Sequence, residues 1–191
     1  ELGYHNTEDL DTADVILINT CCVRETAEDK TLGKIGELKH LKKQNPDLII
    51  AVTGCMAQEW QDKLFKRAPH IDLVIGTHNI HKLIELIRER RSKADHYMAA
   101  DMTLPAFHDM PVKRFQKFFA WIPIMNGCNK FCTYCIVPYV RGREVSRPID
   151  AIVEEIKKVA AEGYKEITLL GQNVNSYGLD LKDGTDFSKL V

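Results

Sequence analysis

Three cysteines that lie close together are the residues of this chain best suited to chemistry. Cys128, Cys132 and Cys135 have the spacing C-x3-C-x2-C, and no cysteine follows them in the sequence. Thiolates are soft ligands that bind iron–sulfur clusters or zinc. Three thiolates on one short loop would hold three irons of a [4Fe–4S] cluster and leave the fourth iron open to a small molecule. The loop therefore predicts a cluster that takes part in catalysis.

Two other thiol chemistries use the same residues. A zinc site needs a fourth ligand, for which His96 or His108 is available, but structural zinc sites usually pair their ligands on two knuckles. Cys132 and Cys135 alone would make a redox dithiol, which leaves Cys128 without a role. An iron–sulfur cluster is the interpretation that uses all three cysteines.

The composition is that of an ordinary globular protein. With 191 residues, 45% hydrophobic and 28% charged, the chain has room for one large or two small domains. The net charge of −1 provides no global basic field for nucleic acid. We find no signal peptide and no apolar stretch long enough to span a bilayer, so the six cysteines favour metal ligation over disulfides. We expect a cytoplasmic protein without membrane contact.

Residues 1–91 alternate apolar β-branched runs with amphipathic helical segments. Strands are expected at 15–18, 48–52 and 71–75, and helices at 24–43, 56–67 and 78–91. This alternation with short links predicts an α/β domain with a parallel, doubly wound sheet. Such a sheet would lack its usual first strand, so we expect the natural protein to begin upstream.

Cys21 and Cys55 each come three residues after a predicted strand. Because parallel strands end at one edge of a sheet, where ligands bind, both thiols are expected at the same rim. The alternative is that each is a buried structural thiol. Cys22 should point away from Cys21, and we interpret it as a packing thiol. Two ligands would not hold a cluster firmly, so we expect a third thiol in the upstream segment.

The rest of the chain is expected to form a linker and a second domain. Residues 92–117, with Pro105 and Pro111, predict an interdomain linker. Its basic and aromatic end, 113–118, fits either a nucleic-acid surface or a solvated linker. From 118 to 191 we expect a strand at 118–124, the cysteine loop, a helix from Pro148 to Gly163 and a strand at 166–170. This is the start of a (β/α) barrel, which two strands cannot close.

At this point several motifs together resemble one known family, the radical S-adenosylmethionine (SAM) methylthiotransferases. The cysteine spacing with Tyr134 before the last cysteine is similar to the radical SAM signature. Residues 170–178 are most similar to the MiaB-type branch, which modifies an isopentenylated adenosine of tRNA. The matching segments are 19–21, 23–24, 54–58, 127–144, 146–147 and 170–178.

The family pattern also contains parts that this sequence does not show. It has an earlier cysteine at a strand end, further barrel strands and a C-terminal RNA-binding TRAM domain, so we expect the 191-residue chain to be inactive by itself. Cys22 stands where the family more often has a small residue.

The resemblance implies two [4Fe–4S] clusters and SAM as cofactors. Cys128, Cys132 and Cys135 would hold the cluster whose open iron chelates SAM, and Cys21 and Cys55 would hold an auxiliary cluster. The resemblance further implies that Tyr134 lies near the adenine of SAM and that Gln172 and Asn173 line the SAM pocket. The alternative for Tyr134 is that it simply packs within the protein. The resemblance also implies a tRNA substrate, a flavodoxin- or ferredoxin-like electron donor and a monomer.

The function implied is a methylthio transfer to C2 of N6-isopentenyladenosine at position 37 of the tRNA anticodon loop, by radical SAM chemistry. The alternatives are a methylthiotransferase for a ribosomal protein, a non-catalytic iron–sulfur electron carrier and a zinc-bound nucleic-acid module. Arg141, Arg143 and Arg147 follow the cysteine loop. They would contact phosphates or the SAM carboxylate, or else form ion pairs with Glu144 or Asp150.

Overall fold

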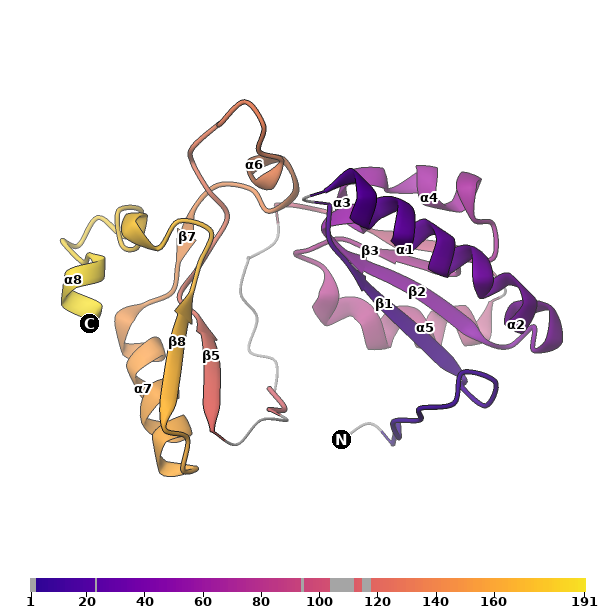
Figure 1. Ribbon diagram of the computed structural model, residues 1–191, viewed down its shortest axis with the longest axis horizontal. Helices are drawn as coiled ribbons and strands as arrows, with labels where there is room; N and C mark the ends of the chain where they lie inside the picture. Colours follow the sequence, from indigo (N-terminus) through magenta and orange to yellow (C-terminus); the bar gives the residue numbers. More distant parts are fainter. Residues whose placement is uncertain (1–2, 23, 94, 104–111, 115–117) are drawn as a thin grey trace. The chain divides into compact units, whose positions relative to one another are not determined.

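The computed structural model describes residues 3–22, 24–93, 95–103, 112–114 and 118–191. The chain is an α/β protein that divides into two compact units, Glu1–Leu104 and Pro105–Val191 (Figure 1). His108 and the predicted linker at 104–111 and 115–117 lie outside the described residues, as does Val23.

A parallel four-stranded sheet forms the centre of the first unit. Its strand order is β1 (Val15–Thr20), β2 (Ile49–Gly54), β3 (Leu73–Ile75) and β4 (Tyr97–Ala99). The predicted parallel sheet is confirmed. Strand β4 lies inside the segment expected to be a linker; it is short and has no β-branched run, so its sequence gave little signal. Backbone hydrogen bonds from Tyr97 N to Asp72 O and from Gly76 N to Ala99 O fix it beside β3.

Helices cover both faces of this sheet. Ile49 and Ala51 of β2 pack with Leu86 and Ile87 of α5 (Leu83–Ser92), whereas Ile50, which alternates with them, faces the other side and is also fully buried. Burial on both faces explains the nearly continuous apolar runs of these strands. The remaining helices of the unit are α1 (Glu25–Glu37), α2 (Lys39–Gln44), α3 (Cys55–Trp60), α4 (Asp62–Arg67) and the 3₁₀ turn η1 (Ile80–Lys82).

Two of the predicted helices are each divided in the structure. The helix expected at 24–43 separates into α1 and α2 at Leu38, whose N–H bonds to the carbonyl of Ile35 in a tight turn. The helix expected at 56–67 separates into α3 and α4 at Gln61, which has a φ of 47°. Apolar periodicity did not reveal either break, because Leu38, Leu41 and Leu64 still reach the core.

The opposite end of the sheet is held by a buried carboxylate. Asp72, just before β3, accepts hydrogen bonds from Lys42 Nζ at 2.9 Å, from Arg90 Nε at 2.7 Å and from the backbone N–H of Ile50 at 2.8 Å. These bonds link α2 and α5 to the start of the sheet, away from the rim that carries the cysteines.

The second unit contains one strand–helix–strand unit and a small clip. Strand β5 (Phe119–Pro123) pairs in parallel with β8 (Glu166–Leu170), and α7 (Ile149–Ala161) runs alongside both strands (Figure 1). The predicted strands and helix are confirmed. Strands β6 (Met125–Asn126) and β7 (Val145–Ser146) form an antiparallel pair that the sequence analysis missed. The short helices are α6 (Val137–Val140), η2 (Val174–Ser176) and α8 (Phe187–Leu190).

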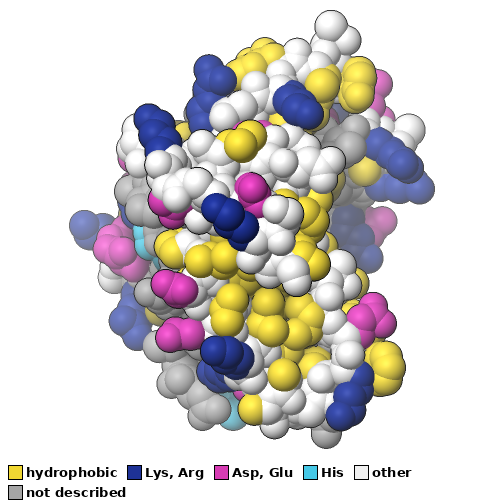
Figure 2. All heavy atoms as spheres, turned by 90° about the vertical axis from the view of Figure 1, so that its left-hand side faces the viewer, with side chains coloured by type: hydrophobic (Ala, Val, Ile, Leu, Met, Phe, Trp, Pro, Cys, Tyr) yellow, Lys and Arg dark blue, Asp and Glu magenta, His cyan; other side chains and the backbone are white. Residues whose placement is uncertain are grey.

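The surface carries no single-sign field on the face that Figure 2 presents, where basic, acidic and hydrophobic side chains are interspersed. No helix among the described residues has the length and apolar character needed to cross a membrane.

Candidate iron–sulfur site: cysteines at the strand ends

The cysteine loop begins directly beyond β5 and is closed at its base. The β6–β7 pair joins the two ends of the loop, and Cys128 N donates to the carbonyl of Gly142 at 3.1 Å. Gly127 has a φ of 78°, and a Cβ there would lie 2.1 Å from the carbonyl oxygen of Arg143. Only glycine fits this crossing. Asn129 Oδ1 accepts a further bond from Glu144 N at 3.1 Å. Hydrogen bonds and a close backbone crossing therefore fix the base of the loop.

The three predicted ligands differ in exposure. Cys128 is buried, Cys135 is half-buried and Cys132 is exposed. Cys135 N donates to Cys132 O at 3.0 Å, which makes a turn of the C-x2-C segment. Lys130 N lies 3.5 Å from Cys128 Sγ and donates to it. Backbone hydrogen bonds to sulfur are one of the means by which proteins set the potential of iron–sulfur clusters.

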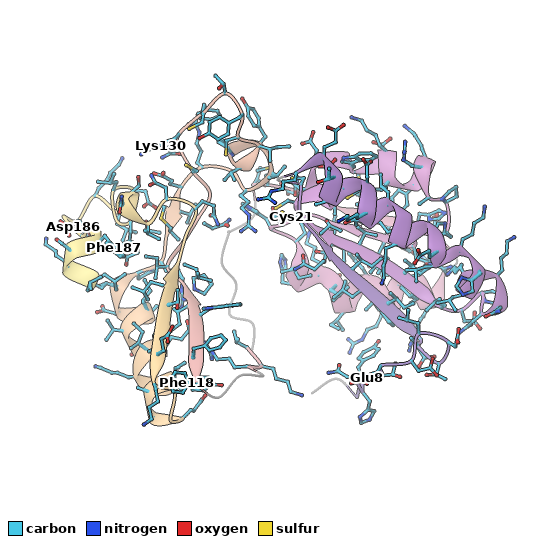
Figure 3. The ribbon with its side chains drawn as sticks, in the orientation of Figure 1. Glu8, Cys21, Phe118, Lys130, Asp186 and Phe187 are labelled. Atoms are coloured by element: carbon cyan, nitrogen blue, oxygen red, sulfur yellow. The ribbon has the colours of Figure 1, made fainter. Side chains whose placement is uncertain are left out.

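Aromatic side chains surround the exposed part of the loop. Phe131 packs edge-on against Tyr139, with ring centroids 5.7 Å apart, and Arg143 stacks over Phe131 at 4.7 Å. Figure 3 marks Lys130, the neighbour of Phe131, on this loop. Tyr134 is 90% exposed, so it does not fill the packing role that was its alternative interpretation. Its ring is open to a ligand.

The loop after β8 is fastened to the base of the cysteine loop. Asp180 accepts from Ser146 Oγ at 2.5 Å and from Ser146 N at 2.9 Å, and Ser146 Oγ in turn accepts from Gly178 N at 2.9 Å. The buried Tyr177 donates its hydroxyl proton to Arg147 O at 2.8 Å. The segment that carries the predicted SAM-binding residues is therefore attached to β7. Sequence reasoning missed this network because its members are separated along the chain.

The two predicted SAM-binding residues on this loop, Gln172 and Asn173, differ in exposure and in hydrogen bonding. Gln172 is exposed. Asn173 is half-buried, and its Nδ2 donates to Ser176 Oγ at 2.5 Å while its carbonyl accepts from Ser176 N. Asn173 therefore also shapes the turn that follows the strand.

Two arginines of the second unit share one carboxylate of α7. Arg147 pairs with Glu155 of α7 at 2.8 Å, and Arg114 pairs with the other oxygen of the same carboxylate. The sequence had suggested Glu144 or Asp150 as ion-pair partners and did not point to Glu155. Glu144 is 8% exposed, and its Oε1 has no hydrogen-bond partner among the described residues. The sequence analysis named Glu144 only as an ion-pair partner.

In the first unit, Cys21 and Cys55 follow directly after paired positions of neighbouring strands. Thr20 is paired with Gly54, and Thr20 Oγ1 donates to Thr53 O at 2.6 Å. A Cβ at Gly54, whose φ is 95°, would lie 2.4 Å from Thr20 O, so the strand ends approach closely. Cys21 is exposed at the end of β1, as Figure 3 shows, and Cys55 is buried as the first residue of α3.

Cys22 is buried, as expected of a packing thiol, but its neighbour was not predicted. Its thiol shares a hydrogen bond with the thiol of Cys55. This contact, together with burial, raises the pKa of Cys22 above its ordinary value; Glu28 and Cys21 raise it less. The rim thus brings Cys22 and Cys55 together.

These residues suit an iron–sulfur cluster in their chemistry. Each loop cysteine is a free thiol, and Cys128 Sγ already accepts a backbone hydrogen bond. No group of three or more Cys, His, Asp or Glu side chains within the described ranges converges closely enough to hold a metal ion. The zinc alternative is weakened, because His96 bonds to Ile71 O at 2.7 Å and packs against Phe65.

Comparisons with known proteins divide the chain in the same way. The uncharacterized protein family UPF0004 matches residues 1–76, and the radical SAM superfamily matches residues 122–187. A radical SAM domain implies a [4Fe–4S] cluster and SAM.

Curated relatives match nearly the whole chain, and each of the following is named tRNA-2-methylthio-N(6)-dimethylallyladenosine synthase. The protein of Bacillus licheniformis is 50% identical over 191 residues, which cover 95% of this chain and 36% of the relative. That of Desulforamulus reducens is 52% identical over 194 residues, covering 100% and 42%. That of Staphylococcus aureus strain JH9 is 52% identical over 185 residues, covering 95% and 36%. The chain thus spans 36% to 42% of the length of these relatives.

Proposed function

We propose, since the chain belongs to the radical SAM methylthiotransferase family, that it is part of an enzyme that adds a methylthio group to C2 of N6-isopentenyladenosine at position 37 of tRNA. The observation that carries the proposal is the cysteine loop beyond β5, closed by β6 and β7 and fastened to the loop after β8. Relatives about half identical to this chain bear names that state this chemistry.

Cys128, Cys132 and Cys135 are the ligands we propose for the SAM-binding cluster. When bound, the cluster and SAM supply a one-electron cleavage that yields a 5′-deoxyadenosyl radical. The chain contributes the positions of the ligands, the N–H of Lys130 toward Cys128 Sγ and a closed loop base. Tyr134 presents an exposed ring that suits stacking on the adenine. Gln172 and Asn173, just beyond β8, are the proposed lining of the SAM pocket.

The first unit is the proposed site of the auxiliary cluster, which takes part in sulfur delivery. Cys21 and Cys55 follow paired strand positions and are its proposed ligands. The same proposal includes a cytoplasmic, monomeric enzyme that receives electrons from a flavodoxin- or ferredoxin-like donor. Its tRNA contacts must come from local patches, since the net charge is only −1.

Mass spectrometry of tRNA nucleosides tests the function directly. We expect cells that lack the gene encoding this chain to contain isopentenyladenosine without its methylthio group, and the intact gene to restore the modified nucleoside. Unchanged methylthio nucleosides in the deletion strain would instead direct attention to a ribosomal-protein substrate.

Two substitutions in the complete gene product separate the proposed roles of the cysteines. Cys132→Ala should abolish reductive formation of 5′-deoxyadenosine, because the SAM-binding cluster loses a ligand. Cys21→Ala should preserve that cleavage and stop sulfur insertion. Retained cleavage in the first variant, or a normal yield of methylthio product in the second, would contradict the assignment.

A further inference from the structure

We propose that the outer part of the cysteine loop is a stacking platform for an unpaired RNA base, formed by Phe131, Tyr139 and Arg143. The inference rests on the tRNA substrate proposed above and adds which side chains of this chain meet the RNA. The occupant is a base next to the modified adenosine, because the platform belongs to the loop whose cysteines are the proposed ligands of the SAM-binding cluster.

The three side chains form one contact group drawn from both arms of the loop. The rings of Phe131 and Tyr139 meet edge-on with centroids 5.7 Å apart, and the guanidinium carbon of Arg143 lies 4.7 Å from the centroid of the Phe131 ring. Phe131 directly precedes Cys132, whereas Tyr139 lies in α6 and Arg143 comes just before β7. Edge-on aromatic pairs and cation–π contacts hold their members in defined orientations. The loop therefore presents a preformed group rather than three independent side chains.

These side chains are open to solvent. Phe131 is 49% exposed, Tyr139 is 63% exposed, and Arg143 is also exposed. In α6 the residues on either side of Tyr139, Pro138 and Val140, are buried, so the short helix is anchored through them and Tyr139 is turned outward. The contacts within the group thus leave much of each ring uncovered, and a flat aromatic surface is what a base stacks on.

The backbone beneath Arg143 is fixed by the base of the loop. The carbonyl oxygen of Arg143 lies at the close crossing with Gly127, and the preceding carbonyl, that of Gly142, accepts a hydrogen bond from Cys128 N at 3.1 Å. A binding group that is held in place before its ligand arrives loses less conformational entropy on binding. Arg143 is therefore positioned for stacking before RNA binds.

The charge of the loop favours a nucleic acid. Residues 127–143 contain the basic residues Lys130, Arg141 and Arg143 and no aspartate or glutamate, although the whole chain has a net charge of −1. Arg141 is held at the loop base, where its Nη1 donates to Asn126 Oδ1 at 3.3 Å. Arg143 brings its charge into the exposed group itself, and a guanidinium plane stacks on bases as aromatic rings do. The platform thus combines ring faces with local positive charge, as sites for single-stranded nucleic acids do.

An acidic protein, such as an electron donor, would be attracted by the same charge, but the location of the platform favours the RNA. Under the proposed function the substrate base must come to this loop, because the radical forms at the iron that the three cysteines leave open. An electron can enter the cluster from another side, so an electron donor does not need these side chains.

Photocrosslinking tests the platform in the complete enzyme loaded with its clusters. An anticodon stem-loop that contains isopentenyladenosine carries 5-iodouridine at a loop position directly beside it, because this base crosslinks to aromatic side chains against which it stacks. After irradiation, the complex is digested with ribonuclease and trypsin and analysed by mass spectrometry. We expect the crosslink in the tryptic peptide 131–141, at Phe131 or Tyr139. Crosslinks confined to Tyr134 or to other peptides would overturn the proposal.

Substitutions separate stacking from charge. Loss of one stacked base weakens binding about 5- to 140-fold, so Tyr139→Leu should raise the Kd of the stem-loop by this factor, whereas Tyr139→Trp should keep it low. Arg143→Lys retains the charge but removes the guanidinium plane, and it should also weaken binding. The matched control is Tyr4→Leu in the first unit, where Tyr4 is likewise an exposed ring with an arginine, Arg91, over it at 5.8 Å. Its Kd should not change.

Iron content and circular dichroism establish that each variant is loaded and folded, and Arg143→Lys carries the comparison if Tyr139→Leu loses iron. Wild-type affinity in the loaded variants would overturn the platform. So would unchanged RNA affinity with weakened binding of reduced flavodoxin, which would assign the surface to the electron donor. These results are distinct from a failure of the proposed function, in which deletion of the gene leaves the methylthio nucleosides of tRNA unchanged.

Discussion

At the scale of single residues, the chemistry of the chain depends on where each thiol lies. Cys132 is exposed and Cys128 is buried beneath a backbone N–H, although both belong to one motif. Cys21 and Cys22 are adjacent in sequence, yet Cys21 is exposed and Cys22 is buried beside Cys55. Spacing predicted which cysteines belong together in the loop. It could not predict the Cys22–Cys55 contact, because the direction of a side chain beyond a strand end is set by the fold.

Gly127 is the residue on which the closed loop depends most directly. We expect Gly127→Ala to destabilise the second unit by about 2–4 kcal/mol, since alanine adds left-handed strain and a clash with the carbonyl of Arg143. Urea unfolding measures the loss. Gly163→Ala is the control, because its φ of 95° gives similar strain with nothing within 4 Å of the added Cβ. Equal losses in the two variants would show that the clash has no effect.

Tyr177 predicts a pH dependence of stability. Burial raises the pKa of its phenol, with Asp183 adding to the shift, so the fold favours the neutral form. The stability it contributes is complete below about pH 10, the ordinary tyrosine pKa, and is lost as the pH rises through the higher value of the folded state. Tyr177→Phe should therefore lose about 1–3 kcal/mol at neutral pH and decline less steeply than wild type at alkaline pH. Urea unfolding from pH 8 to 11 compares the slopes; parallel slopes would contradict the prediction.

At the scale of elements, apolar patterns predicted what is buried and missed what is held by polar contacts. β8 begins and ends where its sequence predicted, because its apolar run is bounded by glycine and charge. β4, β6 and β7 were missed, since each is two or three residues long and is fixed by pairing with a distant segment. For the site, the same limit applies: the motif located the cysteines, whereas the Ser146–Asp180 link and the buried Glu144 depend on tertiary structure.

Asp72 gives the clearest test of how elements are joined in the first unit. Asp72→Asn should destabilise it by about 3–5 kcal/mol, because Lys42 and Arg90 would keep buried charges without their counterion. The control is Asp62→Asn, whose pair with Lys66 is exposed and screened by solvent, so its loss should change stability little. Chemical unfolding monitors both variants. A small effect at Asp72 would mean that water replaces the lost carboxylate.

At the scale of the whole molecule, the chain combines two α/β units. Each unit places its cysteines beyond the carboxyl ends of parallel strands, which is where open α/β sheets and (β/α) barrels carry their ligands. The composition is nearly neutral, and Arg147 and Arg114 are occupied by Glu155. These two arginines are therefore neutralised by a carboxylate within their own unit.

This charge balance leads to an expectation for RNA affinity. We expect the 191-residue chain to bind an anticodon stem-loop no more tightly than non-specific complexes do, with a Kd of about 10⁻⁴ to 10⁻⁶ M at physiological salt. Fluorescence anisotropy with a labelled stem-loop measures the affinity. Nanomolar binding that persists at high salt would refute the expectation.

The clip formed by β6 and β7 has a consequence for the order of events during synthesis. Its two strands flank the cysteine loop and lie closer in sequence than β5 and β8, so contacts within the clip are the more local ones and need less of the chain. The loop can therefore close once Ser146 has left the ribosome, before β8 has emerged. Protease protection of ribosome-bound nascent chains would detect this early closure. The thiols that define the site would then be gathered on a hairpin before the parallel pair that supports it exists.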